Sequence, residues 1–93
     1  MLEHLIEEKL CKAVKKHNGL ALKFVSPGFV GVPDRILLFP NGILSFVELK
    51  APGKKPRPLQ FKRIEQLRKL GFKVFVLDHP DQIELVIKEI LDV

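Results

Sequence analysis

The 93-residue chain contains no tryptophan, no tyrosine and a single cysteine. Cys11 cannot form an internal disulfide, and the three histidines are too scattered to complete a zinc site. No apolar run approaches the roughly 20 residues that cross a bilayer, and the first residues lack the pattern of a signal peptide. We therefore expect a cytoplasmic protein that has no contact with membranes.

Several motifs of common enzymes are also missing. There is no glycine-rich phosphate loop, no nucleophile elbow and no internal repeat. The length predicts one domain over residues 1–93, with little core to spare. Sixteen Lys and Arg residues against eleven Asp and Glu residues give a net charge of +5, which favours a polyanion as partner.

Hydrophobic periodicity predicts an α/β fold with the element order α-β-β-β-α-β and a C-terminal helix, in which helices flank a mixed sheet. The predicted helices cover residues 2–17, 58–70 and the segment after Pro80, and the predicted strands cover residues 20–25, 34–39, 43–50 and 73–77. The apolar positions expected to be buried in the first two helices are Leu2, Leu5, Ile6, Leu10, Ala13, Val14, Leu59, Ile64, Leu67 and Leu70. The two-sided apolar strand 73–77 is expected to be central in the sheet.

The turn between strands 34–39 and 43–50 decides which side chains meet. A two-residue loop of Asn41 and Gly42 would place Asp34 and Glu48 on opposite faces. A three-residue loop, with Pro40 opening a type I turn and Gly42 in the left-handed conformation, instead places Asp34 directly opposite Glu48. The second register suits all three loop residues, and we therefore predict it.

In that register Asp34 and Glu48 share one face of the sheet with Lys50. Residues directly opposite on antiparallel strands have Cβ atoms about 4.5–5.5 Å apart. Two carboxylates at this separation repel one another unless a cation lies between them. Oxygen ligands of this kind favour Mg²⁺ or Mn²⁺, so the sequence predicts a site for one of these ions.

Other polar residues can complete such a site. Glu7 lies at the edge of the buried stripe of the first helix, whereas Glu8 points to solvent and Glu3 lies in the first turn, although all three stay possible as the helical carboxylate. Gln60 lies near the charged group at the start of the second helix. Its amide either hydrogen-bonds a metal-bound water, a phosphate or a catalytic carboxylate, or it caps backbone groups of the helix.

Basic and polar residues next to these strands are candidates for DNA contacts. The proline-rich segment 51–58 is stiff and positively charged, and it follows Lys50 directly. The glycine- and proline-containing loop 26–33 leads into Asp34. The candidate nucleic-acid contacts are Lys23, Ser26, Lys54, Lys55, Arg57 and Arg63.

These motifs together resemble the PD-(D/E)XK nuclease superfamily and, more narrowly, its virus-type replication-repair nuclease domain, VRR-NUC. The likeness extends over nearly the whole chain. The segments that carry it are Lys23 to Gly28, Gly31 to Arg35, Phe46 to Gly53, Pro58 to Gln60 and Leu67 to Gly71. Each short pattern is common by itself, and it is their order, with Gln60 in place, that is specific.

The resemblance implies a role for each matching residue. The implied metal ligands are Asp34, Glu48, the backbone carbonyl of Leu49, and Glu7 directly or through water. Lys50 would orient or activate the attacking water, and Gln60 would support the site. The implied reaction is hydrolysis of DNA that leaves 5′-phosphate and 3′-hydroxyl ends.

The resemblance also implies a location and a substrate, because short stand-alone members come from phages and bacteria and are similar to Holliday junction resolvases. The implied location is a phage or bacterial cell interior. We therefore expect a homodimer that cuts branched DNA, since a two-fold axis relates two sites for two cuts. Two alternatives stay open at this stage. One is a non-catalytic module that binds branched DNA, and the other is a small protein-interaction domain.

Overall fold

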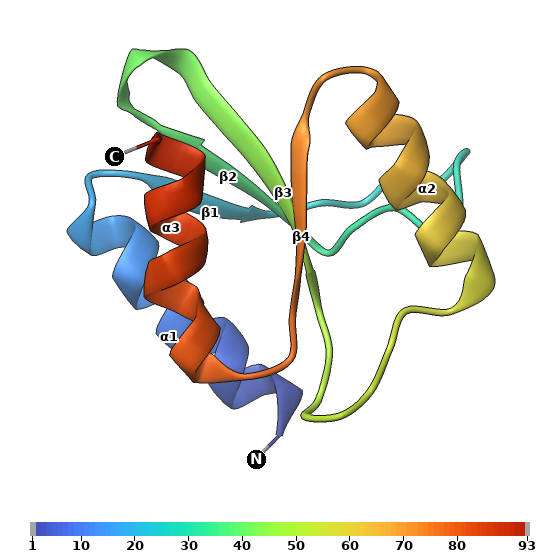
Figure 1. Ribbon diagram of the computed structural model, residues 1–93, viewed down its shortest axis with the longest axis horizontal. Helices are drawn as coiled ribbons and strands as arrows, with labels where there is room; N and C mark the ends of the chain where they lie inside the picture. The colour runs from blue at the N-terminus through green and yellow to red at the C-terminus, as the bar shows by residue number, and fades with distance from the viewer. Residues whose placement is uncertain (1, 93) are drawn as a thin grey trace.

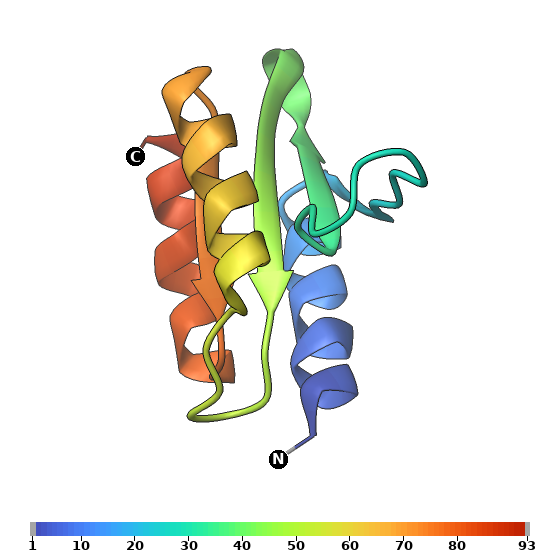
Figure 2. The ribbon, with the colours of Figure 1, turned by 90° about the vertical axis from the view of Figure 1, so that its right-hand side faces the viewer.

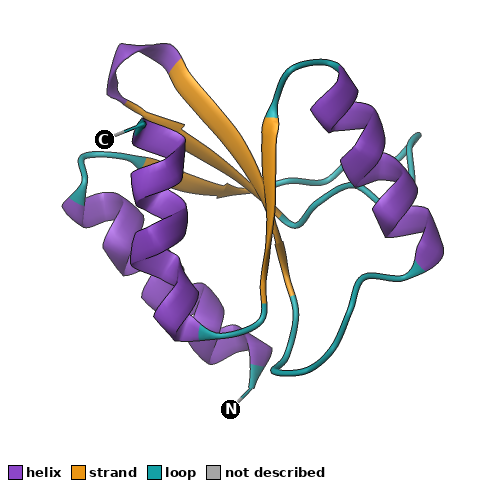
Figure 3. Ribbon diagram, viewed as in Figure 1, coloured by secondary structure: helices purple, strands orange, loops and turns teal. Residues whose placement is uncertain are grey.

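The computed structural model describes residues 2–92 and shows a mixed four-stranded sheet with helices on both faces (Figures 1 and 3). The elements in chain order are α1 (Glu3–Lys16), β1 (Leu20–Lys23), β2 (Arg35–Phe39), the 3₁₀ turn η1 (Pro40–Gly42), β3 (Ile43–Leu49), α2 (Pro58–Lys69), β4 (Lys73–Leu77), the 3₁₀ turn η2 (Pro80–Gln82) and α3 (Ile83–Leu91). The predicted fold class and element order are confirmed.

The strand order of the sheet is β1-β2-β3-β4. The first three strands are antiparallel, and β4 runs parallel to β3. The expectation that β4 is central was wrong, because it forms one edge of the sheet. Its two-sided apolar character arises because α2 packs on one face of the sheet and α3 on the other (Figure 1).

The hairpin of β2 and β3 has the predicted register, with Phe39 paired to Ile43 and Ile36 paired to Phe46. The predicted turn type was wrong, however. Asn41 as well as Gly42 has a positive φ, of 71° and 73° respectively, whereas both central residues of a type I turn have negative φ. Asparagine tolerates this left-handed conformation, so the loop length and register are kept with different dihedral angles.

The sheet separates two apolar clusters. On one face, α1 and α3 cover Leu37, Val47 and Leu49. On the other face, α2 contributes Ile64, which packs with Phe46 and Val74. Figure 1 shows the strands between α2 on one side and the pair α1 and α3 on the other, and Figure 2 looks onto the side that α2 covers. Alternate side chains of β3 therefore face different helices, and Glu48 shares the α2 face with Phe46.

Several apolar residues at helix ends do not lie in the core as expected. Leu2, Leu5, Leu59 and Leu70 are all exposed, and Leu67 is half-buried. The residues buried in the middle of these helices, including Ile6, Leu10 and Ile64, are those expected. The apolar period continues to the end of each helix, but burial also requires a neighbouring element at that point, which periodicity does not reveal.

Gly19 provides a test of the packing between the end of α1 and the hairpin. A Cβ atom at this position would lie 2.5 Å from the carbonyl oxygen of Leu38 and 2.9 Å from Cγ1 of Val14. We predict that Gly19→Ala lowers the free energy of unfolding by about 1–3 kcal/mol, because backbone must move to relieve the clash. Urea denaturation measures this change. Gly28→Ala is the matched control, since nothing lies within 4 Å of its Cβ, and an equal loss in both variants would contradict the prediction.

Candidate active site

Glu48 is a carboxylate buried inside the sheet. It lies near the end of β3, between β2 and β4, and is 1% exposed. Neither carboxylate oxygen has a hydrogen-bond partner among the described residues. The Nζ of Lys50 lies 3.2 Å from Oε2, which makes an ion pair without hydrogen-bond geometry. A buried charge with so few partners destabilises a fold, and such residues are rarely tolerated without a functional reason.

Asp34 immediately precedes β2, and the structure holds it against the end of β3. Its Oδ2 accepts a hydrogen bond of 2.8 Å from the backbone N–H of Leu49. The pairing of Arg35 with Val47 extends by one residue to place Asp34 opposite Glu48. The two acidic groups therefore converge on the α2 face, together with Lys50.

The electrostatics of Glu48 reflect this convergence. The pKa of the Glu48 carboxyl is raised from 4.5 to about 7, chiefly by burial and secondly by the negative charge of Asp34. The Lys50 ammonium acts in the opposite direction but does not compensate. Near neutral pH, the group is thus poised between its protonated and ionised forms.

This donor set fits a divalent cation. The unpartnered oxygens of Glu48 and the adjacent Asp34 carboxylate are hard oxygen donors, which Mg²⁺ and Mn²⁺ prefer. Within residues 2–92, no group of three or more His, Cys, Asp or Glu side chains is suited to a metal. A cation at this pair would therefore take its remaining ligands from backbone carbonyls, such as that of Leu49, and from water.

Glu7 does not join this pair. Its carboxylate lies 2.9 Å from the guanidinium of Arg35, on the side of the sheet that α1 covers. Of the three candidate carboxylates of the first helix, Glu7 is the half-buried one, while Glu3 and Glu8 are exposed. Arg35 was missed in the sequence, although its position directly after Asp34 is a signal that it points to the opposite face.

Gln60 adopts the capping arrangement. Its Oε1 accepts a 2.8 Å hydrogen bond from the backbone N–H of Arg57, which precedes α2. This bond satisfies one of the free N–H groups at the start of the helix. The side-chain amide is nearly buried on the α2 face, and the same bond leaves the two hydrogens of its NH₂ group available as donors.

The candidate DNA contacts lie in or beside two loops and on α2. Lys54, Lys55 and Arg57 are exposed on the segment that connects β3 to α2. Lys23 is exposed at the end of β1, and Ser26 is half-buried in the loop that follows. Arg63 differs from the rest because its guanidinium is already bonded to the loop 24–34, through the carbonyl of Val30 at 2.8 Å.

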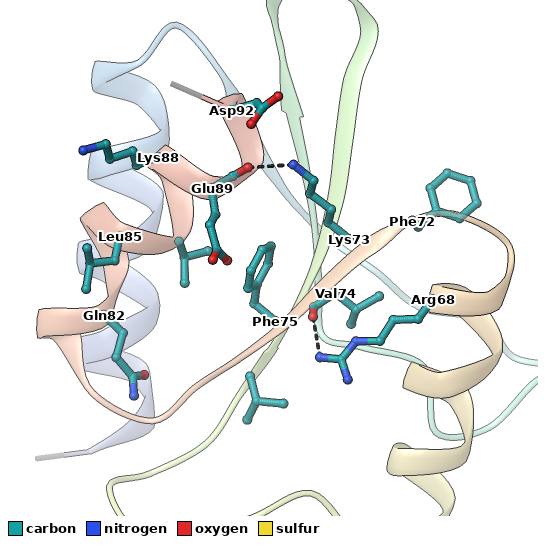
Figure 4. Close-up of a pocket in the computed structure, with 12 residues that line it drawn as sticks. Arg68, Phe72, Lys73, Val74, Phe75, Gln82, Leu85, Lys88, Glu89 and Asp92 are labelled. Atoms are coloured by element: carbon teal, nitrogen blue, oxygen red, sulfur yellow. Dashed lines mark hydrogen bonds between the residues drawn. The ribbon is translucent and has the colours of Figure 1, made fainter.

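A wide groove lies elsewhere on the described chain. It has a volume of about 1000 Å³ and runs along the open edge of β4, between α2 and α3 (Figure 4). Arg68 and Lys73 reach across it to the backbone carbonyls of Val74 and Glu89. None of the predicted site residues lines this groove, so we locate the functional site from the buried carboxylate rather than from cavity size.

The fold and the Asp-Glu-Lys group at the end of its hairpin define the class of PD-(D/E)XK nucleases. Residues 2–79 match the profile of the VRR-NUC domain, and the chain belongs to this family. It is 52% identical over 79 residues to a protein named "Putative nuclease p44" from Acyrthosiphon pisum secondary endosymbiont phage 1, with 85% of each chain covered. A solved structure of a VRR_NUC domain superposes with a TM-score of 0.86 at 31% identity and covers 92% of this chain and 94% of that one.

Among residues 2–92, no helix has the length and apolar character needed to cross a membrane.

The buried Glu48 makes stability depend on pH. The folded chain keeps the proton up to about pH 7, and the unfolded chain releases it near 4.5. The group therefore favours folding below pH 4.5, and this contribution is lost as the pH rises to 7. We predict that Glu48→Gln is more stable than the wild type at pH 8 with EDTA, by up to about 3 kcal/mol.

Urea titrations at pH 5 and pH 8 measure this difference. Glu8→Gln removes the same charge from an exposed position and should leave the pH dependence unchanged. A Glu48→Gln variant that is less stable than the wild type in EDTA at pH 8 would contradict the prediction. With millimolar Mg²⁺ we expect the order to reverse, because a cation that binds only the folded wild type stabilises it.

Proposed function

We propose that the protein is a Mg²⁺- or Mn²⁺-dependent endodeoxyribonuclease that hydrolyses phosphodiester bonds in branched DNA, such as Holliday junctions, during replication, recombination or repair. The observation that carries this proposal is the buried Glu48 carboxylate, which has no hydrogen-bond partner within residues 2–92 and lies beside Asp34 and Lys50. The family and the phage relative named as a nuclease support it.

In this proposal Asp34, Glu48 and the carbonyl of Leu49 hold the cation, and Glu7 acts only indirectly, through its ion pair with Arg35. When bound, the cation neutralises charge at the scissile phosphate and provides a water nucleophile near neutral pH. The hydrogen bond from the N–H of Leu49 fixes the Asp34 carboxylate in the required direction. Burial in the sheet fixes Glu48, so neither group must be ordered when substrate binds.

Lys50 has the position of a group that acts on the phosphate. Its ammonium is mostly buried and lies beside Oε2 of Glu48. An ammonium there can orient a water molecule and stabilise the negative charge that develops on the phosphate oxygens. The free amide hydrogens of Gln60 are proposed to support the site from the start of α2.

The proposed DNA contacts are the basic and polar groups around this site. They are Lys23, Ser26, Lys54, Lys55, Arg57 and Arg63. The charged side chains among them bind phosphates without reading sequence, which suits recognition of DNA shape. The segment from Lys54 to Arg57 follows Lys50 closely, and we expect it to contact the strand that is cut.

A cleavage assay tests this function. The protein is incubated with labelled four-way junction, flap and linear duplex, in Mg²⁺, Mn²⁺ or chelator. We predict that Asp34→Asn and Lys50→Ala still bind the junction but cut at least 10²-fold more slowly, because each removes a group that acts in the transition state. Lys88→Ala, which removes an exposed charge from α3, is the control and should cut like the wild type.

Each outcome has a clear meaning. Cutting that needs metal and is lost in both variants supports the proposal. A protein that binds the junction but cuts no DNA with either metal is the non-catalytic module instead. Equal cutting of junction and duplex would support the nuclease activity but contradict the proposed selectivity for branched DNA.

We also propose that the protein acts as a homodimer, because resolving a junction takes two cuts that a two-fold axis relates. Sedimentation equilibrium at micromolar concentrations should give twice the mass of the chain. A monomer alone at these concentrations, with the junction still cut on both strands, would contradict the dimer.

A further inference from the structure

The loop between β1 and β2 is a defined projection and lies next to the acidic pair. Its ends are joined by a hydrogen bond of 2.8 Å from the N–H of Phe24 to the carbonyl of Asp34. Within the loop the N–H of Phe29 donates to the carbonyl of Ser26. In Figure 2 the loop extends away from the sheet, and its tip is held to α2 by the hydrogen bond from Arg63 to the carbonyl of Val30. It therefore presents its outer residues to solvent beside the proposed catalytic residue Asp34.

Arg63 of α2 fixes the tip of this loop. Its Nε donates to the carbonyl of Val30 at 2.8 Å, and its Nη1 donates to Oε1 of Gln66 at 3.0 Å. The guanidinium carbon lies 3.6 Å from the centre of the Phe29 ring, which is the distance of a close cation–π stack. These three contacts hold the aromatic ring in one orientation.

The tip of this loop remains exposed to solvent. Phe29 is 44% exposed and Val30 is 66% exposed, although an apolar tip of this kind would gain from burial. The guanidinium of Arg63 covers one face of the Phe29 ring. Basic side chains among the proposed DNA contacts, such as Lys23 at the end of β1, attract phosphates. A flat, polarisable surface backed by a cation is the kind of surface on which nucleobases stack in proteins that bind single strands.

We propose that Phe29, backed by Arg63, is a stacking platform for an unpaired base within about five nucleotides of the phosphate that is cut. This inference rests on the proposed nuclease function and adds how branched DNA is recognised. Phe29 is five residues from Asp34, so the chain allows at most about 18 Å between their Cα atoms. That separation corresponds to about five nucleotide steps of 3.4 Å. Bases are unpaired at a flap or can open at a junction, whereas a linear duplex offers none away from its ends.

The chain has no tryptophan, so Phe29→Trp introduces a single fluorescent reporter that can still stack. We expect its emission to be quenched when a flap or a single-stranded oligonucleotide binds, and to change little with a blunt hairpin duplex of equal length. The titrations use EDTA, so that no DNA is cut. Phe61→Trp is the matched control, because Phe61 is 46% exposed on α2 and is not part of the stack. Its emission should not distinguish the two kinds of DNA.

Affinity provides the second measurement. Phe29→Ala should weaken binding to flap DNA about tenfold and binding to the hairpin duplex less than twofold, because only an unpaired base can stack. Phe61→Ala should leave both affinities unchanged. Equal losses for flap and duplex, or an unquenched indole with bound flap DNA, would overturn the platform.

These results are separate from the fate of the nuclease itself. If the wild-type protein cuts DNA in Mg²⁺ but both measurements at position 29 fail, the proposed nuclease function stands and the platform is rejected. If the indole is quenched and affinity for flap DNA is selectively lost, but the protein never cuts DNA, the platform stands and the protein is a DNA-binding module.

Discussion

The whole arrangement depends on keeping one acidic side chain inside the sheet. Glu48 is buried between two neighbouring strands and its oxygens have no hydrogen-bond partner in the described chain. Asp34 adds a second negative charge, and Lys50 compensates only in part. Such an arrangement is unfavourable in the metal-free protein, and a divalent cation at the pair would remove the repulsion. We regard this local instability as the feature that fits the fold for metal-dependent chemistry.

The two faces of the sheet have different tasks. The face under α1 and α3 holds the larger apolar cluster, including Leu10, Leu37 and Ile87. The α2 face holds a smaller cluster and the polar side chains at the end of β3. The hairpin links the two, because alternate residues of β2 face opposite helices. Asp34 is thus directed to the site, while its neighbour Arg35 pairs with Glu7 on the other face.

Local sequence was sufficient for the hairpin and insufficient for longer-range geometry. Pro40, Asn41 and Gly42 determine a three-residue loop, and the loop length determines which residues pair, so Asp34 and Glu48 could be placed from the sequence. The edge position of β4 could not be predicted from the sequence. A strand with apolar residues on both faces has the same sequence pattern at an edge covered by helices as it has between two other strands. The stack of Arg63 on Phe29 joins residues 34 positions apart, and no local pattern indicates it. Glu7 was correctly chosen as the inward-facing carboxylate, but its partner is Arg35 rather than the acidic pair.

The most direct test of this account is the position of a bound cation. A crystal grown with Mn²⁺, measured at a wavelength where manganese scatters anomalously, would locate the ion without reference to activity. The account predicts a peak between the carboxylates of Asp34 and Glu48, within coordination distance of the Leu49 carbonyl, and no peak in a crystal of Asp34→Asn. A fully occupied manganese site elsewhere, with Glu48 still buried and without a metal, would contradict it.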